Sequence, residues 1–148
     1  MSPLGNYDYV VNLAANVSFT LPMTEAYNAN VRTSLNVAKL CKEMGARLVH
    51  FSTAYVGSTN EQADLNWEAI RDSVEGDQSH ASSEMMRLSY PNTYSFTKAV
   101  AEHAILSLCP EACIIRPSIV GPSVAYPRPG WSPNPSTVTA GAAWWLKR

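Results

Sequence analysis

The stretch Arg47-Leu48-Val49-His50-Phe51-Ser52 decides the fold class, because it is an apolar run of strand length that begins just after a glycine suited to end a helix. The residues before it predict that helix, since Thr24 can cap its start and Gly45 stands at its end. Its apolar positions recur at helical spacing, namely Val37, Leu40, Cys41 and Met44. Before the helix, the apolar run in Tyr7–Ala15 predicts a first strand that is buried on both faces.

The same alternation continues toward the C-terminus. A segment that includes Tyr94 predicts a helix that Pro110 stops, with a packing face made by Ala101, Ala104, Ile105 and Leu108. A third strand is predicted over Ala112–Arg116. Strand, helix, strand, helix, strand indicates an α/β fold whose parallel strands are joined by helical crossovers, here in a single domain that spans 1–148.

Two segments depart from this regular pattern. Residues 57–90 are polar and longer than an ordinary connection, which favours a functional or lid-like insertion, with a short helix expected at Asn66–Ile70. Residues 121–135 are rich in proline and are expected to form a loop. An apolar helix over roughly 137–147 is predicted to close the sequence.

Composition excludes several classes of function. The net charge of -1 and the lack of a Lys/Arg run argue against nucleic acid binding. No apolar stretch approaches the roughly 18 to 20 residues that span a bilayer, and the first residues lack the features of a signal peptide, so we expect a cytoplasmic protein with no membrane segment in this chain, organelle association being left open. The three cysteines lack metal-site spacing, so we expect no metal and two small buried thiols.

Tyr94 and Lys98 stand four residues apart and therefore on one face of their predicted helix. A phenol, with an unperturbed pKa of about 10, is a poor proton donor near neutrality, but a nearby ammonium favours the phenolate and lowers that pKa. The pair can therefore act as an acid/base device. The competing interpretation is an accidental pair on a solvated helix.

Ligands of parallel sheets bind beyond the carboxyl ends of the strands. Ala14 and Ala15 follow the first strand, and their small side chains would let a cofactor approach the backbone. The hydroxyl residues Ser52 and Thr53 follow the second strand and would give the tyrosine a polar partner. The third strand is followed by Pro117, Ser118 and Ile119.

Five motifs, in this order, resemble those of extended short-chain dehydrogenases/reductases. They are Leu13-Ala14-Ala15, Asn30 with Asn36-Val37, Phe51-Ser52-Thr53-Ala54-Tyr55, Tyr94-x-x-x-Lys98 and Arg116-Pro117-Ser118-Ile119-Val120. Together with Pro91–Glu102 and Pro129-Gly130-Trp131, they are similar to the fatty acyl-CoA reductase (male-sterility) group and the related thioester-reductase domains. The resemblance implies part of a Rossmann-like, doubly wound parallel sheet and a nicotinamide cofactor, NADPH, with NADH left open.

The resemblance also implies a role for each site residue. Tyr94 would donate a proton to the substrate carbonyl oxygen as hydride arrives from the nicotinamide, and Lys98 would bind the nicotinamide ribose and lower the pKa of Tyr94. Thr53, with Ser52 as the alternate, would hydrogen-bond the oxygen that becomes negative in the transition state. Asn30 would help to hold a water near the lysine. The implied cofactor contacts are Ala14, Ala15, Ser52, Tyr94, Lys98, Pro117, Ser118 and Ile119.

The implied reaction is the NAD(P)H-dependent reduction of a fatty acyl-CoA or another acyl thioester to an aldehyde or an alcohol. The alternatives are another extended short-chain reductase or epimerase, and a non-catalytic half-Rossmann module that binds a partner. Simpler interpretations also exist for single residues: Thr53 as the cap of a turn, Asn30 as a polar residue on a helix surface, His50 and His103 as structural, and Arg116 as the partner of a carboxylate.

One part of the family pattern is missing, because no G-x-x-G-x-x-G or G-x-G-x-x-G turn for the cofactor pyrophosphate occurs in the chain. We therefore expect an N-terminally truncated domain without its glycine-rich βαβ unit, and a C-terminal part that is also cut short. The outer edge of the first strand and one apolar layer would then face water. The sequence predicts weak cofactor binding by this chain alone and self-association through the exposed sheet edge.

Overall fold

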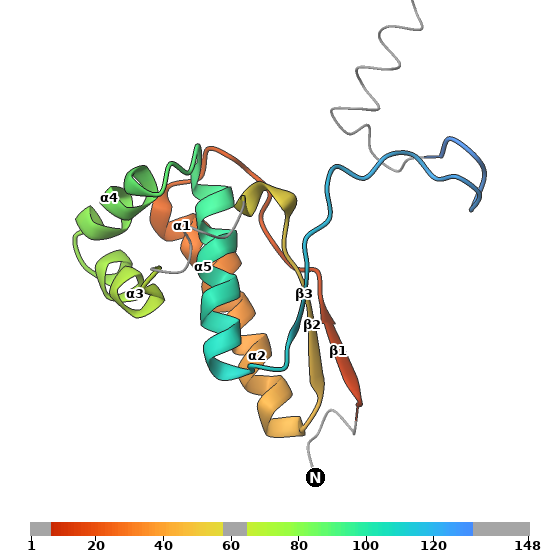
Figure 1. Ribbon diagram of the computed structural model, residues 1–148, viewed down its shortest axis with the longest axis horizontal. Coiled ribbons are helices and arrows are strands. Elements are labelled where there is room, and N and C mark those ends of the chain that lie inside the picture. The colour runs from red at the N-terminus through yellow and green to blue at the C-terminus, as the bar shows by residue number, and fades with distance from the viewer. Residues whose placement is uncertain (1–6, 58–64, 132–148) are drawn as a thin grey trace, which may run out of the picture. The chain divides into compact units, whose positions relative to one another are not determined.

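The computed structural model describes residues 7–57 and 65–131, and the chain divides into two compact units, Met1–Arg116 and Pro117–Arg148. In the first unit, three parallel strands lie in the order β1 (Tyr9–Asn12), β2 (Arg47–Phe51) and β3 (Cys113–Ile115). The described helices lie on one side of these strands (Figure 1). This arrangement confirms the predicted α/β class and is consistent with part of a Rossmann-like fold.

A long helical segment joins β1 to β2 and consists of α1 (Met23–Tyr27), a π-helical turn (Asn28–Arg32) and α2 (Thr33–Met44). The prediction that Thr24 caps this segment is wrong. Pro22 occupies the N-cap position and its carbonyl accepts the first helical hydrogen bond from the Ala26 amide at 2.9 Å. Gly45 ends α2 in the left-handed conformation, with φ 68°, as predicted.

The buried face of α2 differs in part from the predicted one. Of the four predicted positions only Cys41 is fully buried, and the others are half-buried. The centre of the face is made by the small residues Ser34 and Ala38, which allow α2 to lie close to the sheet, with Leu48 of β2 in the same cluster as Ala38 and Cys41. As predicted, two of the cysteines, Cys41 and Cys109, are buried.

The segment between β2 and the Tyr94 helix is more structured than predicted. After a short 3-10 turn (η2, Ala54–Val56), the described part contains α3 (Trp67–Glu75) and α4 (Ser79–Arg87). The helix expected at Asn66–Ile70 therefore runs longer, and α4 was not expected. Both helices bury apolar residues in the main core, among them Ile70, Val74 and Ala81. A lid-like role for this segment stays a prediction.

Helix α5 (Thr93–Leu108) carries Tyr94 and Lys98 and is the most deeply buried element. Every residue from Tyr94 to Glu102 is buried, which contradicts the interpretation of a solvated helix. The predicted packing residues Ala101, Ala104 and Ile105 are buried and Leu108 is half-buried. The helix ends at Leu108, with Cys109 as its C-cap just before Pro110, as predicted. Helix α5 packs on the π-helical turn and α2.

Asn92 fixes the start of α5, because its Oδ1 accepts a hydrogen bond from the Ser95 amide at 2.9 Å. We expect Asn92→Ala to lower the free energy of unfolding by about 1 kcal/mol, the usual cost of losing such a cap. Urea denaturation measures this change. Asn92→Asp keeps an acceptor at the cap and is the matched control; an equal loss in both variants would contradict the capping role.

One face of strand β1 is exposed to water. The prediction that the first strand is buried on both faces is wrong, because Tyr9 is 58% and Val11 is 52% exposed, while Asn12 is buried. The described helices all lie on one face of the sheet, so the side chains of β1 that point to the opposite face meet water. Self-association through this strand stays a prediction.

The described part of the second unit, residues 117–131, contains bends and turns without a helix or strand. Backbone hydrogen bonds close a local turn there, with the Ser123 amide donating to the Trp131 carbonyl at 2.8 Å and the Gly130 amide to the Ser123 carbonyl at 2.8 Å. These residues are the described part of the loop predicted over 121–135. The helix expected over 137–147 lies outside the described residues.

Across 7–57 and 65–131, no helix is both long enough and apolar enough to cross a bilayer.

Candidate active site

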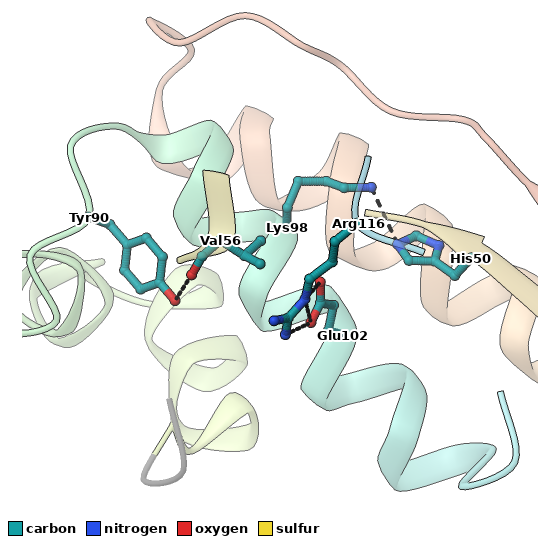
Figure 2. Close-up of polar contacts among 6 residues, drawn as sticks. All are labelled: His50, Val56, Tyr90, Lys98, Glu102 and Arg116. Atoms are coloured by element: carbon teal, nitrogen blue, oxygen red, sulfur yellow. Dashed lines mark hydrogen bonds and ion pairs between the residues drawn. The ribbon is translucent and has the colours of Figure 1, made fainter. Parts of the chain in front are cut away.

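Lys98 lies in a buried polar cluster between α5 and the sheet. Its Nζ donates a hydrogen bond to the Phe51 carbonyl at 2.7 Å and lies 3.3 Å from His50 Nε2 (Figure 2). The side chain is 1% exposed, and this burial lowers the pKa of Lys98 to about 8, an effect that nearby Glu102 opposes. Within the described residues, Lys98 makes no polar contact with the Tyr94 hydroxyl.

The cluster extends from His50 to β1 through Asn12. Asn12 Nδ2 lies 3.1 Å from His50 Nδ1 and donates to Ser34 Oγ at 3.3 Å, while its Oδ1 accepts from the Ala14 amide at 3.1 Å. His50 is fully buried, and burial, together with the charge of Lys98, lowers its pKa to about 4. From the sequence, His50 is expected to be structural, and no role is expected for Asn12.

A signal for this pair was present in the sequence. Asn12 and His50 are polar residues within two apolar strand segments, and both are buried. His50 shares its face of β2 with Leu48, two residues earlier, which is buried as well. The register of the parallel strands then places Asn12 directly beside His50. Two buried polar residues in register must satisfy each other, which a pattern of single strands does not reveal.

Burial of neutral His50 makes the stability of the fold depend on pH. Its pKa falls from 6.5 in the unfolded chain to about 4 in the folded one, so the unfolded state binds the proton more readily. Above pH 6.5 His50 is neutral in both states and does not lower the stability of the fold. As the pH falls from 6.5 toward 4, the unfolded chain takes up the proton first and the free energy of unfolding decreases. We expect the free energy of unfolding to drop by about 2 kcal/mol from pH 7 to pH 5 through this group.

Urea denaturation at a series of pH values measures this dependence. His50→Gln removes the titrating group, so its curve should be flatter between pH 7 and pH 5 than that of the unchanged chain. His80→Gln is the matched control because His80 is exposed. If the unchanged chain and His50→Gln lose stability equally over this interval, His50 is not buried in its neutral form.

Tyr94 lies among aromatic side chains from the segments that follow β1 and β2. Its ring centroid is 5.6 Å from that of Phe19, which in turn is 5.9 Å from that of Tyr55. Tyr94 is 9% exposed and Phe19 is 51% exposed. The segments beyond two strand ends therefore meet at the start of α5, where the rule for parallel sheets places ligands. No role for Phe19 is expected from the sequence.

The two hydroxyl residues after β2 differ in their partners. Thr53 Oγ1 accepts a hydrogen bond from the Tyr55 amide at 3.2 Å, which confirms that Thr53 caps the turn. Its hydroxyl hydrogen can still be donated to another group. Ser52 Oγ is buried and has no hydrogen-bond partner among the described residues, although the Ser52 amide donates to the Ile115 carbonyl at 2.7 Å.

Asn30 joins three elements and is not a surface residue, since it is 1% exposed. Its Oδ1 accepts from the Asn16 amide at 2.8 Å, and its Nδ2 donates to the Asn16 carbonyl at 3.2 Å and to Thr97 Oγ1 at 3.1 Å. These bonds tie the segment after β1 to α5. Asn30 lies in the π-helical turn, a type of distortion that is frequent at functional sites. The predicted water-holding role stays a prediction.

The remaining predicted cofactor contacts fall into two groups. Ala14 and Ala15 are exposed just beyond β1, and the Ala14 amide is fixed by Asn12. Pro117, Ser118 and Ile119 belong to the second unit, so the structure does not place them relative to Tyr94 or Lys98.

An ion pair connects α5 to the end of β3. The Arg116 guanidinium binds the Glu102 carboxylate with Nε at 3.0 Å from Oε1 and Nη2 at 2.5 Å from Oε2 (Figure 2). Glu102 is only 4% exposed and Arg116 is 32% exposed at their side chains. The predicted pairing of Arg116 with a carboxylate is thereby confirmed. The carboxylate in turn raises the pKa of Arg116 further.

The sequence is similar to those of several curated fatty acyl-CoA reductases. A fatty acyl-CoA reductase 1 of Xenopus laevis is 32% identical over 142 residues, covering 86% of this chain and 27% of that protein. The enzyme of the same name from Gallus gallus is 32% identical over 139 residues, covering 84% of this chain and 27% of that protein. The human protein of that name is 31% identical over 139 residues, with coverage of 84% and 27%.

The chain thus spans about a quarter of the length of these curated relatives. The sequence family described as Male sterility protein, an NAD-binding family, matches residues 3–146, which is nearly the whole chain. This match agrees with the parallel sheet and with the fatty acyl-CoA reductase resemblance of the motifs around Ser52, Tyr94 and Arg116. The chain belongs to the male sterility protein family.

Proposed function

We propose that this chain carries the proton-transfer site of an NAD(P)H-dependent reductase that converts a fatty acyl-CoA or another acyl thioester to an aldehyde or an alcohol. The observation that carries the proposal is the placement of Tyr94 at the start of a buried helix, beside the segments that follow β1 and β2. Membership of the male sterility family and the names of the relatives support an acyl substrate.

The residues after the strands fit a nicotinamide cofactor. Ser52 Oγ is a buried polar atom without a partner among the described residues, and such an atom is costly unless a ligand or water satisfies it. Ala14 and Ala15 are small and exposed, and they follow β1, the strand next to β2, which Ser52 follows. When bound, the cofactor would supply hydride to the carbonyl carbon of the substrate.

The residues of the chain would then act on the oxygen of that carbonyl. Tyr94 would give its hydroxyl proton to the oxygen, and Thr53, whose hydrogen is free to be donated, would stabilise the developing negative charge. Lys98 has donors beyond the one that binds Phe51, and one of them would bind a ribose hydroxyl. Asn30 would hold the segment after β1 in place while these contacts form.

The loop after β1 supports an apolar substrate over a nucleotide sugar. Its exposed side chains include Leu13 at 66%, Val17 at 70% and Phe19 at 51%, and Phe19 contacts the Tyr94 ring. Exposed apolar side chains gathered beside a polar site mark a surface that binds an apolar ligand. We assign this loop to the acyl chain near the thioester.

The test is an assay of the full-length product of the gene with an acyl-CoA and either NADPH or NADH. Oxidation of the cofactor, release of free CoA and formation of aldehyde or alcohol are followed together by mass spectrometry. We expect all three with NADPH. A nucleotide sugar is the control substrate, and turnover of the sugar without turnover of acyl-CoA would overturn the proposal in favour of another extended reductase or epimerase.

A further inference from the structure

The hydrogen bonds around Asn12 fix which way its amide points. Its Oδ1 must face the Ala14 amide, which is a donor at 3.1 Å, so its Nδ2 faces both Ser34 Oγ and His50 Nδ1. Ser34 Oγ donates its own hydrogen to the Asn30 carbonyl at 2.7 Å and can therefore accept from Nδ2. Each contact is satisfied in this orientation, whereas the flipped amide would place two donors together at Ala14.

The amide orientation in turn selects the tautomer of His50. Because Asn12 Nδ2 is a donor, His50 Nδ1 must be the acceptor at 3.1 Å. A neutral imidazole carries one hydrogen, so this hydrogen is on Nε2, and Nε2 lies 3.3 Å from Lys98 Nζ. The Lys98 ammonium has hydrogens only and cannot accept, whereas the uncharged amine has a lone pair.

We propose that His50 is a positioning residue that presents an Nε2–H to Lys98 Nζ and thereby favours the uncharged amine of Lys98. Among the described residues, the charge of Glu102 acts in the opposite direction and raises the pKa of Lys98. Glu102 is the carboxylate on the same helix, and Arg116 already binds it through two nitrogens. Burial acts in the same direction as His50, because it lowers the pKa of Lys98.

The consequence for catalysis rests on the proposed function. Reduction of a carbonyl consumes one proton per hydride, so Tyr94 must regain the proton it donates. A lysine that gains and loses a proton near neutral pH can pass one on, whereas a permanently charged lysine cannot. His50 would set the pH at which Lys98 does so, without contacting substrate itself.

The tautomer of His50 tests the proposal without cofactor or substrate. The chain has three histidines, so ¹⁵N spectra of histidine-labelled protein contain few signals, and His80→Gln and His103→Gln assign that of His50 by elimination. We expect an unprotonated Nδ1 and a protonated Nε2 at pH 7. A protonated Nδ1, or an imidazolium, would overturn the proposal even if the protein proves to be a reductase.

Two variants test the effect on Lys98, whose ε-carbon signal is one of four from lysine and is assigned by its loss in Lys98→Arg. His50→Gln can offer an oxygen to the ammonium, so the pKa of Lys98 should rise by at least one unit. Asn12→Asp replaces the donor facing Nδ1 by an acceptor, so the ¹⁵N spectrum should show the hydrogen moving to Nδ1.

The added charge of Asn12→Asp would by itself raise the pKa of Lys98, so the double variant with His50→Gln is the control for the effect of that charge. His103→Gln is the matched control for the histidine change, since His103 lies on α5 and makes no polar contact with Lys98 among the described residues. In the full-length enzyme the pH–rate profile should shift by the same amount as the pKa of Lys98. A Lys98 pKa that His50→Gln leaves unchanged would refute the proposal.

Discussion

Tyr94→Phe is expected to lower the kcat of thioester reduction by about 10³-fold, since positioned proton donors commonly contribute 10² to 10⁴ to a rate. Stability should change little. The Tyr94 ring keeps its contact with Phe19, and the hydroxyl makes no hydrogen bond within residues 7–57 and 65–131. The measurement is kcat, KM and cofactor affinity of the full-length gene product, together with urea denaturation.

Tyr90→Phe is the matched control for this substitution. The Tyr90 hydroxyl donates to the Val56 carbonyl at 3.3 Å (Figure 2). The Tyr90 ring packs against Phe96, so the variant keeps the ring contact and loses the hydrogen bond. We expect a loss of about 1 kcal/mol in the free energy of unfolding with activity within a few-fold of the original. If Tyr94→Phe retained a tenth of the original kcat, Tyr94 would not be the proton donor.

The fold class was predictable because each element carries its own local signal. The strand at β2 is a short apolar run, Gly45 must take a left-handed conformation at the end of α2, and Pro110 cannot continue α5. These signals depend on neighbouring residues alone. The parallel order β1, β2, β3 then follows from the helical crossovers between successive strands.

What could not be predicted depends on residues far apart in the sequence. The π-helical turn forms around Asn30, whose amide is held by Asn16 and by Thr97, a residue 67 positions away. Helix α4 is short, its apolar residues are Ala81, Met85 and Met86, and it packs against α3. A helix of this length is marginal by itself, so contacts with the rest of the fold decide whether it forms.

The candidate site shows the same division. Tyr94, Lys98 and Thr53 were found because their residue types and spacing suit proton transfer. His50 and Asn12 were missed because a single polar residue in an apolar strand has many explanations, and only the register of β1 against β2 brings the two together. The role of Lys98 is altered by this pairing, because its nearest polar partners are His50 and the Phe51 carbonyl.

Arg116→Met is expected to lower the free energy of unfolding by about 2 to 3 kcal/mol, because it leaves the carboxylate of Glu102 buried without its cation. This loss is below the full cost for a buried pair, since Arg116 is 32% exposed and water can reach its place. The same change at Arg32, whose pair with Glu75 is exposed on both sides, should cost less than about 1 kcal/mol.

A double variant separates the net contribution of the ion pair to the free energy of unfolding from the loss caused by removing one partner alone. Glu102→Leu with Arg116→Met removes both charges and should recover most of the stability lost in Arg116→Met, because no uncompensated carboxylate remains in the core. Arg116→Met alone should also raise the pKa of Lys98, since the freed Glu102 charge acts on the same side of α5. Urea denaturation and the Lys98 ε-carbon signal measure the two effects. An Arg116→Met variant as stable as the original would show that Glu102 reaches water, and its carboxylate would then have little influence on the lysine.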